Sequence, residues 1–160
     1  MNDGLRIRLA DLRRGDDQDA VRMLINAYAA DSMGLSRALP PETQLRLVRD
    51  LAGNSSALQF IAWQHESAVG IAVCFLAYST FMARPLVNIH DLYVREDHRR
   101  RGIAAKLLDA VESHASGIGC CRITLEVRHD NVAAQSLYRL KGFSPGTPPY
   151  GFWQKDPNNV

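Results

Sequence analysis

The segment from residue 86 to residue 115 constrains the fold most, because a single glycine joins a predicted strand to a predicted helix. Residues 86–94 are β-branched and apolar enough to form a strand. After Gly102, apolar residues recur at every fourth position, as on one helix face: Ile103, Leu107, Val111 and Ala115. Gly102 therefore begins a helix, where backbone amides lack intrahelical partners and the helix dipole is positive. This arrangement predicts an anion site that suits a pyrophosphate.

The basic residues cluster beside this glycine. Arg95, Arg99, Arg100 and Arg101 fall within seven residues, although the whole chain carries a formal net charge of only +2. That net charge is too small to indicate nucleic-acid binding on its own. Such a run is often a solvated face, and here its meaning depends on the glycine turn beside it.

Length and composition predict one globular domain over residues 1–160, with a frayed polar tail at 156–160. The 160 residues are 46% hydrophobic and 22% charged, which excludes a disordered chain. No segment reaches the roughly 18 apolar residues that a membrane span needs, so no membrane contact is expected. The cysteines, Cys74, Cys120 and Cys121, form neither a disulfide framework nor a zinc site. A reducing cytoplasm fits this pattern, and no metal is expected.

Turn residues divide the chain into alternating strands and helices. Strands are expected at residues 5–10, 57–63, 68–78, 86–94, 121–127, from Phe143 and at 150–154. Helices are expected after a cap at Asp16 or Asp17, at 43–51, after Gly102, and at 132–140 after a cap at Asn131. This order predicts an α/β fold: a mixed, mostly antiparallel sheet of about seven strands, a central βαβ unit and helices on both faces. The parallel pair would be the strands ending at Val94 and beginning near Cys121, with a ligand beyond their carboxyl ends.

Three patterns together resemble the GNAT superfamily of N-acetyltransferases over nearly the whole chain, from Leu5 to about Lys155. The residues Arg99, Gly102 and Ala104 resemble its Arg/Gln-x-x-Gly-x-Gly/Ala acyl-CoA signature. The strand end Asp91-Leu92-Tyr93-Val94 precedes this signature at the distance usual in the family. A later segment is similar to the pattern Asn-x-x-Ala-x-x-x-Tyr-x-x-x-Gly-Phe: Asn131, Ala134, Tyr138, Gly142 and Phe143.

The resemblance implies an acetyl-CoA-dependent N-acetyltransferase. By it, backbone amides from Arg100 to Ala105 would hold the pyrophosphate, and an amide of Leu92, Tyr93 or Val94 would stabilise the oxyanion. Asn131 would contact the pantetheine arm in addition to capping a helix. The full set expected to contact CoA is Leu92, Tyr93, Val94, Arg99, Arg100, Arg101, Gly102, Ile103, Ala104, Ala105, Lys106, Asn131 and Tyr138. The arginine and lysine side chains in this set could equally face solvent.

Catalysis of this kind needs an acid for the leaving thiolate and a base for the amine. Tyr138 matches the family tyrosine that points at the CoA sulfur, although a core position would also explain it. The candidate bases are His90, Asp91 and Glu126. Strand alternation places His90 and Leu92 on one face and Asp91 and Tyr93 on the other.

The acceptor is expected to be a small-molecule primary amine. The region around His90 is similar to the diamine and polyamine acetyltransferase branch, which carries a Glu-Asp pair where this chain has His90-Asp91. His90 thus replaces a carboxylate that would attract a cationic acceptor. This departure counts against a polyamine and keeps an amino-acid-like amine as an alternative acceptor. The acceptor side would include Tyr28, Tyr78, Phe81, His90 and Glu126. The residues also allow a protein N-terminus or lysine as the acceptor, or a non-catalytic acyl-CoA-binding module. An apolar strand at Phe152-Trp153 could join a homodimer.

Overall fold

The computed structural model describes residues 4–157, which form two compact units that meet in sequence between Leu125 and Glu126. The first unit contains β1 (Leu5–Leu9), α1 (Gly15–Ala30), α2 (Pro41–Gly53), β2 (Ala57–Gln64), β3 (Ser67–Ser79), β4 (Arg84–Val94), the 3-10 turn η1 (Glu96–His98), α3 (Ile103–Gly117) and β5 (Ile123–Leu125). The second unit contains α4 (Val132–Leu140). Within residues 4–157 no helix is long and apolar enough to cross a membrane.

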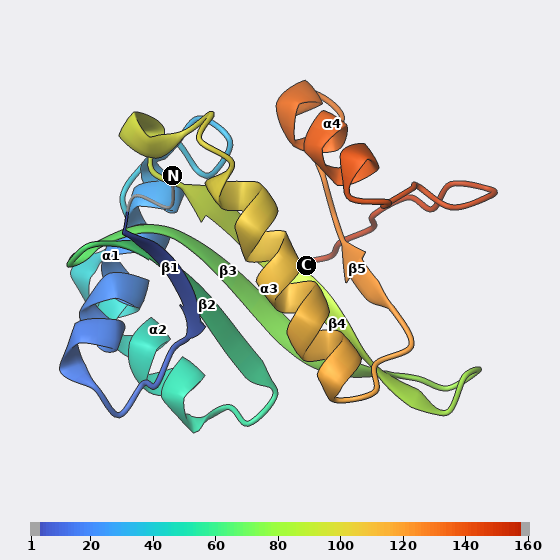
Figure 1. Cartoon of the computed structure of the whole chain (residues 1–160), viewed down its shortest axis with the longest axis horizontal. Coiled ribbons are helices and arrows are strands. Elements are labelled where there is room, and N and C mark those ends of the chain that lie inside the picture. The colour runs from blue at the N-terminus through green and yellow to red at the C-terminus, as the bar shows by residue number, and fades with distance from the viewer. Residues whose placement is uncertain (1–3, 158–160) are drawn as a thin grey trace. The chain divides into compact units, whose positions relative to one another are not determined.

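The sheet runs in the order β1-β2-β3-β4-β5 (Figure 1). All neighbouring pairs are antiparallel except β4 and β5, which are parallel and joined through α3. The predicted βαβ unit is thus confirmed. The prediction of about seven strands is wrong for residues 4–157, which form a sheet of five.

The two strands predicted near the C-terminus are absent from the described part of the second unit. Residues from Phe143 and from Tyr150 to Gln154 form no strand, and the bulky side chains of Tyr150, Phe152 and Trp153 are exposed. Prolines at 145, 148 and 149 lie in this stretch and donate no ladder hydrogen bond, which opposes strand pairing. The tail predicted at 156–160 lies partly outside the described residues, at 158–160.

Helices cover both faces of the sheet, as predicted: α1 and α2 lie against one face and α3 against the other (Figure 1). The face toward α1 is formed by alternate strand residues such as Ile61, Ile71 and Tyr93, which pack with Val21 and Leu24 in one core cluster. The opposite face meets α3, where the Phe60 ring lies edge-on to His114 with centroids 5.6 Å apart. The four predicted contact residues of α3 are all buried: Ile103, Leu107, Val111 and Ala115.

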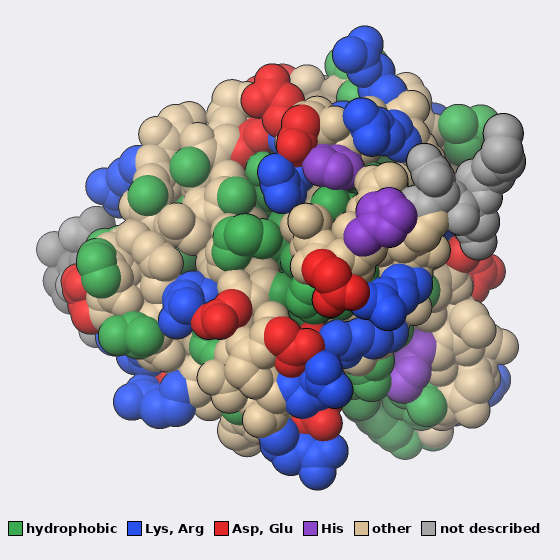
Figure 2. All heavy atoms as spheres, turned by 60° about the vertical axis from the view of Figure 1, so that its left-hand side comes forward, with side chains coloured by type: hydrophobic (Ala, Val, Ile, Leu, Met, Phe, Trp, Pro, Cys, Tyr) green, Lys and Arg blue, Asp and Glu red, His purple; other side chains and the backbone are tan. Residues whose placement is uncertain are grey.

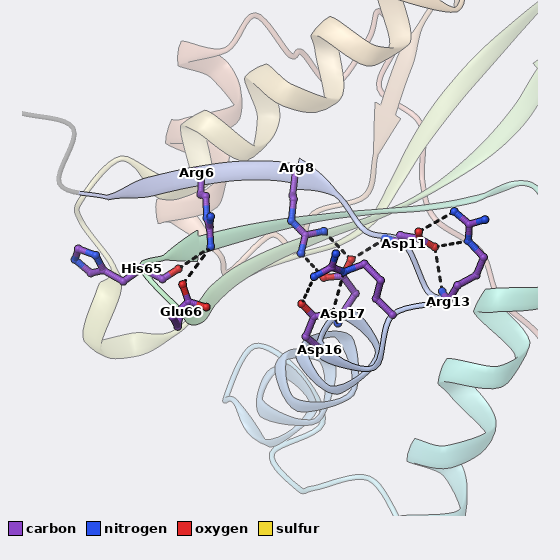
Figure 3. Close-up of polar contacts among 9 residues, drawn as sticks. Arg6, Arg8, Asp11, Arg13, Asp16, Asp17, His65 and Glu66 are labelled. Carbon is purple, nitrogen blue, oxygen red and sulfur yellow. Dashed lines mark hydrogen bonds and ion pairs between the residues drawn. The ribbon is translucent and has the colours of Figure 1, made fainter.

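The start of α1 differs from the prediction. Neither Asp16 nor Asp17 caps the helix, which begins at Gly15 without a side-chain cap. Asp17 is instead buried and accepts two hydrogen bonds from Arg8, both 2.6 Å long, and one of 2.8 Å from the Asp11 amide (Figure 3). This ion pair links α1 to β1. A buried carboxylate without hydrogen-bond donors costs more free energy than an uncapped helix end, so Asp17 pairs with Arg8 instead of capping α1.

Acidic and basic side chains mix across the surface instead of forming one charged field. Figure 2 shows them beside one another over the face that it presents. Several arginines pair with an aspartate close by in the sequence, among them Arg13 with Asp11 and Arg14 with Asp16. The net charge is small because 17 acidic residues nearly balance 19 basic ones, and local pairing of this kind keeps the two signs interspersed.

Candidate functional site

The turn before α3 has the backbone of an anion-binding loop. Arg100 and Gly102 both have positive φ values, 60° and 75°, which turn the chain sharply into the helix. The first intrahelical hydrogen bond runs from the Lys106 amide to the Gly102 carbonyl, 3.1 Å. Three amides come before this bond and therefore have no acceptor within the helix: those of Ile103, Ala104 and Ala105. These donors point outward from the N-terminus of a 15-residue helix.

The space in front of these amides is open. A Cβ atom at Gly102 would have no neighbour within 4 Å, and no side chain caps the helix. A phosphate group can therefore approach the backbone closely, which fits the diphosphate of an acyl-CoA. The side chains of Arg100, Arg101 and Lys106 are exposed around the same turn.

Arg99 is held within the protein by three contacts. Its Nε donates to the Val94 carbonyl at 3.0 Å, its Nη2 pairs with Asp31, and its guanidinium lies 5.7 Å from the Tyr93 ring centre. The sequence predicts this side chain as a phosphate ligand, but the structure places it where it fixes the turn to β4 and to the end of α1. No local pattern indicates this, because Asp31 lies 68 residues away.

A β-bulge interrupts β4 at His90. Asp91 pairs with Val73 of β3, whereas Ile89 pairs with the next residue, Cys74, so His90 is extra. Asp91 consequently shares the face of its partner Val73, which belongs to the core cluster under α1. The His90 ring lies edge-on to Phe75, 5.6 Å between centroids, and Phe75 packs on that same cluster.

The bulge therefore brings His90 and Asp91 to one face of the sheet. The prediction of strict alternation, with His90 and Asp91 on opposite faces, is wrong because the inserted residue resets the pleat. The burial pattern along β4 changes in the same way. The buried positions toward α3 are odd-numbered before the bulge, at Val87 and Ile89, and even-numbered after it, at Val94.

Burial shapes the electrostatics around this pair. Burial raises the pKa of the Asp91 carboxyl, and the charge of His90 opposes the shift. Burial and the Asp91 charge together raise the pKa of the Cys74 thiol to about 12. His90 itself is exposed. The site thus offers an accessible imidazole with a carboxyl group less exposed beside it.

The edge of β4 opens next to the bulge. The parallel ladder with β5 covers only Val87, Asn88 and Ile89. From His90 to Val94, that edge has no strand partner among residues 4–157. On this side the Val94 carbonyl already accepts from Arg99, and the backbone groups of Leu92 and the Val94 amide are available to an extended ligand.

The aromatic residues proposed for the acceptor side occupy two different environments. Tyr28 of α1 stacks on Tyr93 with ring centroids 5.5 Å apart, so it lies on the same sheet face as Asp91. Tyr78 and Phe81 are exposed near the hairpin between β3 and β4. Glu126 is exposed at the first position of the second unit.

The second unit has the local structure predicted around α4. The Asn131 side chain accepts a 3.1 Å hydrogen bond from the Ala134 amide, so it caps α4 as expected. Gly142 follows the helix with a φ of 82°. The Tyr138 ring lies edge-on to Phe143, with centroids 5.9 Å apart. This ring contact would survive replacement of Tyr138 by phenylalanine, so that variant isolates the role of the hydroxyl.

Comparison with known proteins identifies relatives. The model of the acetyltransferase (GNAT) family matches residues 22–143. An aminoglycoside N(6')-acetyltransferase type 1 from Acinetobacter genomosp. 13 is 27% identical, over 71% of this chain and 83% of that enzyme. Thialysine N-epsilon-acetyltransferase from Bos taurus is 32% identical, over 49% of this chain and 46% of that enzyme. The structure of AAC(6')-Iy with a CoA bisubstrate analogue matches with a TM-score of 0.75 and 20% identity, covering 95% of this chain and 98% of that one.

Proposed function

The chain belongs to the GNAT acetyltransferase family and is an acyltransferase; on that premise we propose that it transfers acetyl from acetyl-CoA to a primary amine of a small molecule. The observation that carries this proposal is the open helix N-terminus at Gly102. It follows the part of the β4 edge, from His90 to Val94, that has no strand partner among residues 4–157. The acceptor is a diamine, a polyamine or an amino-acid-like amine. Relatives that act on aminoglycosides and on thialysine support a small-molecule amine.

Two parts of the first unit would hold the co-substrate. The amides of Ile103, Ala104 and Ala105 would bind the diphosphate, helped by the exposed basic side chains around the turn. The edge from Leu92 to Val94 would align the pantetheine arm, and an amide there would donate to the oxyanion that develops on the thioester. Acetyl-CoA supplies the acetyl group as an activated thioester, whose C–S bond breaks as the new C–N bond forms.

The proton leaves the amine toward the His90-Asp91 pair. An alkylamine with a pKa near 10 is mostly protonated at neutral pH, so a base must remove a proton before attack. We assign this role to His90, the exposed member, either directly or through a water. Asp91, less exposed beside it, would stabilise the imidazolium. Tyr138 would give a proton to the leaving thiolate, which balances the reaction.

A thiol-release assay over an amine panel tests the proposal. The panel contains diamines, polyamines, aminoglycosides and basic amino acids, each measured with acetyl-CoA. Replacement of Tyr138 by phenylalanine should lower kcat by about 10²-fold while leaving acetyl-CoA affinity nearly unchanged. Tyr150→Phe, at an exposed tyrosine of the same unit, is the matched control and should keep the wild-type rate.

Three results would contradict the proposal. Tight acetyl-CoA binding without turnover of any amine would indicate an acyl-CoA-binding module. Turnover of peptide N-termini or peptide lysines, with none of the free amines, would indicate a protein acceptor. Equal losses of turnover and CoA affinity in Tyr138→Phe would assign Tyr138 a packing role.

A further inference from the structure

A hollow of about 300 Å³ lies between α2 and β3, outside the residues assigned to CoA. Leu47, Leu51 and Phe75 form its apolar part, and Arg46, Asp50 and Asn54 are polar residues around it. Leu47, Leu51 and Phe75 also belong to, or pack on, the core cluster of the α1 face. The hollow is therefore on the sheet face that carries His90 and Asp91.

Phe75 connects this hollow to the catalytic pair. Its ring lines the hollow and also meets the His90 ring edge-on, with centroids 5.6 Å apart. A molecule in the hollow can thus extend over Phe75 toward His90. The apolar surface of Leu47 and Phe75 suits a chain of methylene groups.

The lining of the hollow includes one cationic side chain, Arg46, and one anionic side chain, Asp50. Asp50 is engaged by its neighbour Arg49, whose Nε donates at 3.0 Å. The Arg46 guanidinium is exposed, and within residues 4–157 it makes no ion pair or hydrogen bond. A guanidinium in this state favours a carboxylate, which it can bind through two parallel hydrogen bonds, and it repels an ammonium group.

We propose that this hollow binds the end of the acceptor remote from the reacting amine, and that this end carries a carboxylate held by Arg46. The inference rests on the proposed function and makes it more specific. The acceptor class is then an aliphatic amino acid with a terminal amine, and diamines and polyamines are disfavoured. Arg46 is a specificity-determining residue that does not touch the reacting atoms.

Lysine and 1,5-diaminopentane test this inference because they differ only by the carboxylate. Steady-state kinetics with saturating acetyl-CoA should give lysine a kcat/KM about tenfold or more above that of the diamine, the order of one charge-assisted contact. Arg46→Gln should raise the KM for lysine about tenfold and leave its kcat unchanged. The KM for the diamine should not rise, because this variant removes only a charge that repels its ammonium group. Arg46→Lys should restore part of the difference.

Arg22→Gln is the matched control, because it removes one positive charge from α1 at a residue that does not line this hollow. It should change neither KM. Equal kcat/KM values for the two acceptors, or an equal loss for both in Arg46→Gln, would overturn the inference and leave the proposed function standing. If no amine is acetylated, the proposed function fails. Calorimetry of both amines with CoA present then tests whether the hollow binds the carboxylate. Equal affinities for lysine and 1,5-diaminopentane would overturn the inference.

Discussion

Asp31, the residue that ends α1, forms an ion pair with Arg99 in the turn before α3. The pair links the segment between the first two helices to the turn proposed to bind diphosphate. Burial alone would raise the pKa of the Asp31 carboxyl, but hydrogen bonds from the Met33 amide and Arg99 lower it below its usual value. The carboxylate is therefore retained in its charged form by the fold.

Loss of this pair should destabilise the protein. Arg99→Ala should lower the free energy of unfolding by about 1–3 kcal/mol, because Asp31 and the Val94 carbonyl each lose a donor. Urea denaturation at pH 7 measures the change. Arg101→Ala, at an exposed arginine of the same turn, should stay within about 0.5 kcal/mol of wild type. Because the folded pKa of Asp31 is lowered, its contribution is present above the ordinary aspartate pKa and should fade as pH falls through the lowered value.

Valine substitutions at Gly102 and Gly119 distinguish two effects of a side chain: strain in the backbone and exclusion of CoA from the helix N-terminus. They lie near opposite ends of α3, have φ values of 75° and 77°, and have open space where a Cβ would be. Valine at either position should cost about 1–2 kcal/mol of stability, since a β-branched residue disfavours this conformation. Only Gly102→Val should also weaken CoA binding in calorimetry. Equal CoA affinity in the two variants would contradict the diphosphate site.

Asp91 should make stability depend on pH in the direction opposite to Asp31. Its folded pKa is raised, so the folded state binds the proton more tightly than the unfolded chain does. The contribution of Asp91 to stability should therefore decline as pH rises from below the ordinary aspartate pKa, about 3.9, through the raised value. Asp91→Asn should lack this decline. Urea midpoints from pH 3 to pH 8 compare the two proteins, and parallel curves would show that Asp91 titrates normally.

The buried ion pair between Arg8 and Asp17 should respond unequally to loss of either partner. The Asp17 side chain is 0% exposed and that of Arg8 is 36% exposed. Arg8→Ala leaves a buried carboxylate without its cation and should cost about 3–5 kcal/mol. Asp17→Ala leaves an arginine that water can reach and should cost less. Arg6→Ala removes an exposed partner of Glu66 and should cost at most about 1 kcal/mol in the same denaturation assay.

Periodicity and turn residues predicted most elements, because these signals are local. The four-residue spacing after Gly102 reports directly which face of α3 is buried, and Asn131 caps α4 through a bond three residues along the chain. The parallel pairing of β4 and β5 followed from the helix between them. These features need no knowledge of distant contacts.

The features that the sequence did not reveal depend on distant partners or on a break in periodicity. Asp17 resembles a helix cap in sequence, but β1 brings Arg8 to it in the fold (Figure 3). The motif that begins at Arg99 makes this residue resemble a phosphate ligand, and nothing near it in sequence indicates its ion pair with Asp31. The faces of His90 and Asp91 were misassigned because one extra residue in β4 reverses the alternation.

Because β4 pairs with β5 only from Val87 to Ile89, hydrogen exchange at the remaining amides of this edge can show whether a ligand is bound there. Amides on the open side between His90 and Val94 have no strand acceptor within the described residues, so they should exchange with solvent deuterium readily. An extended ligand laid along this edge would supply acceptors and slow exchange at alternate positions only, since successive amides point to opposite edges. Exchange measured residue by residue would thus give the register of a bound molecule without any turnover.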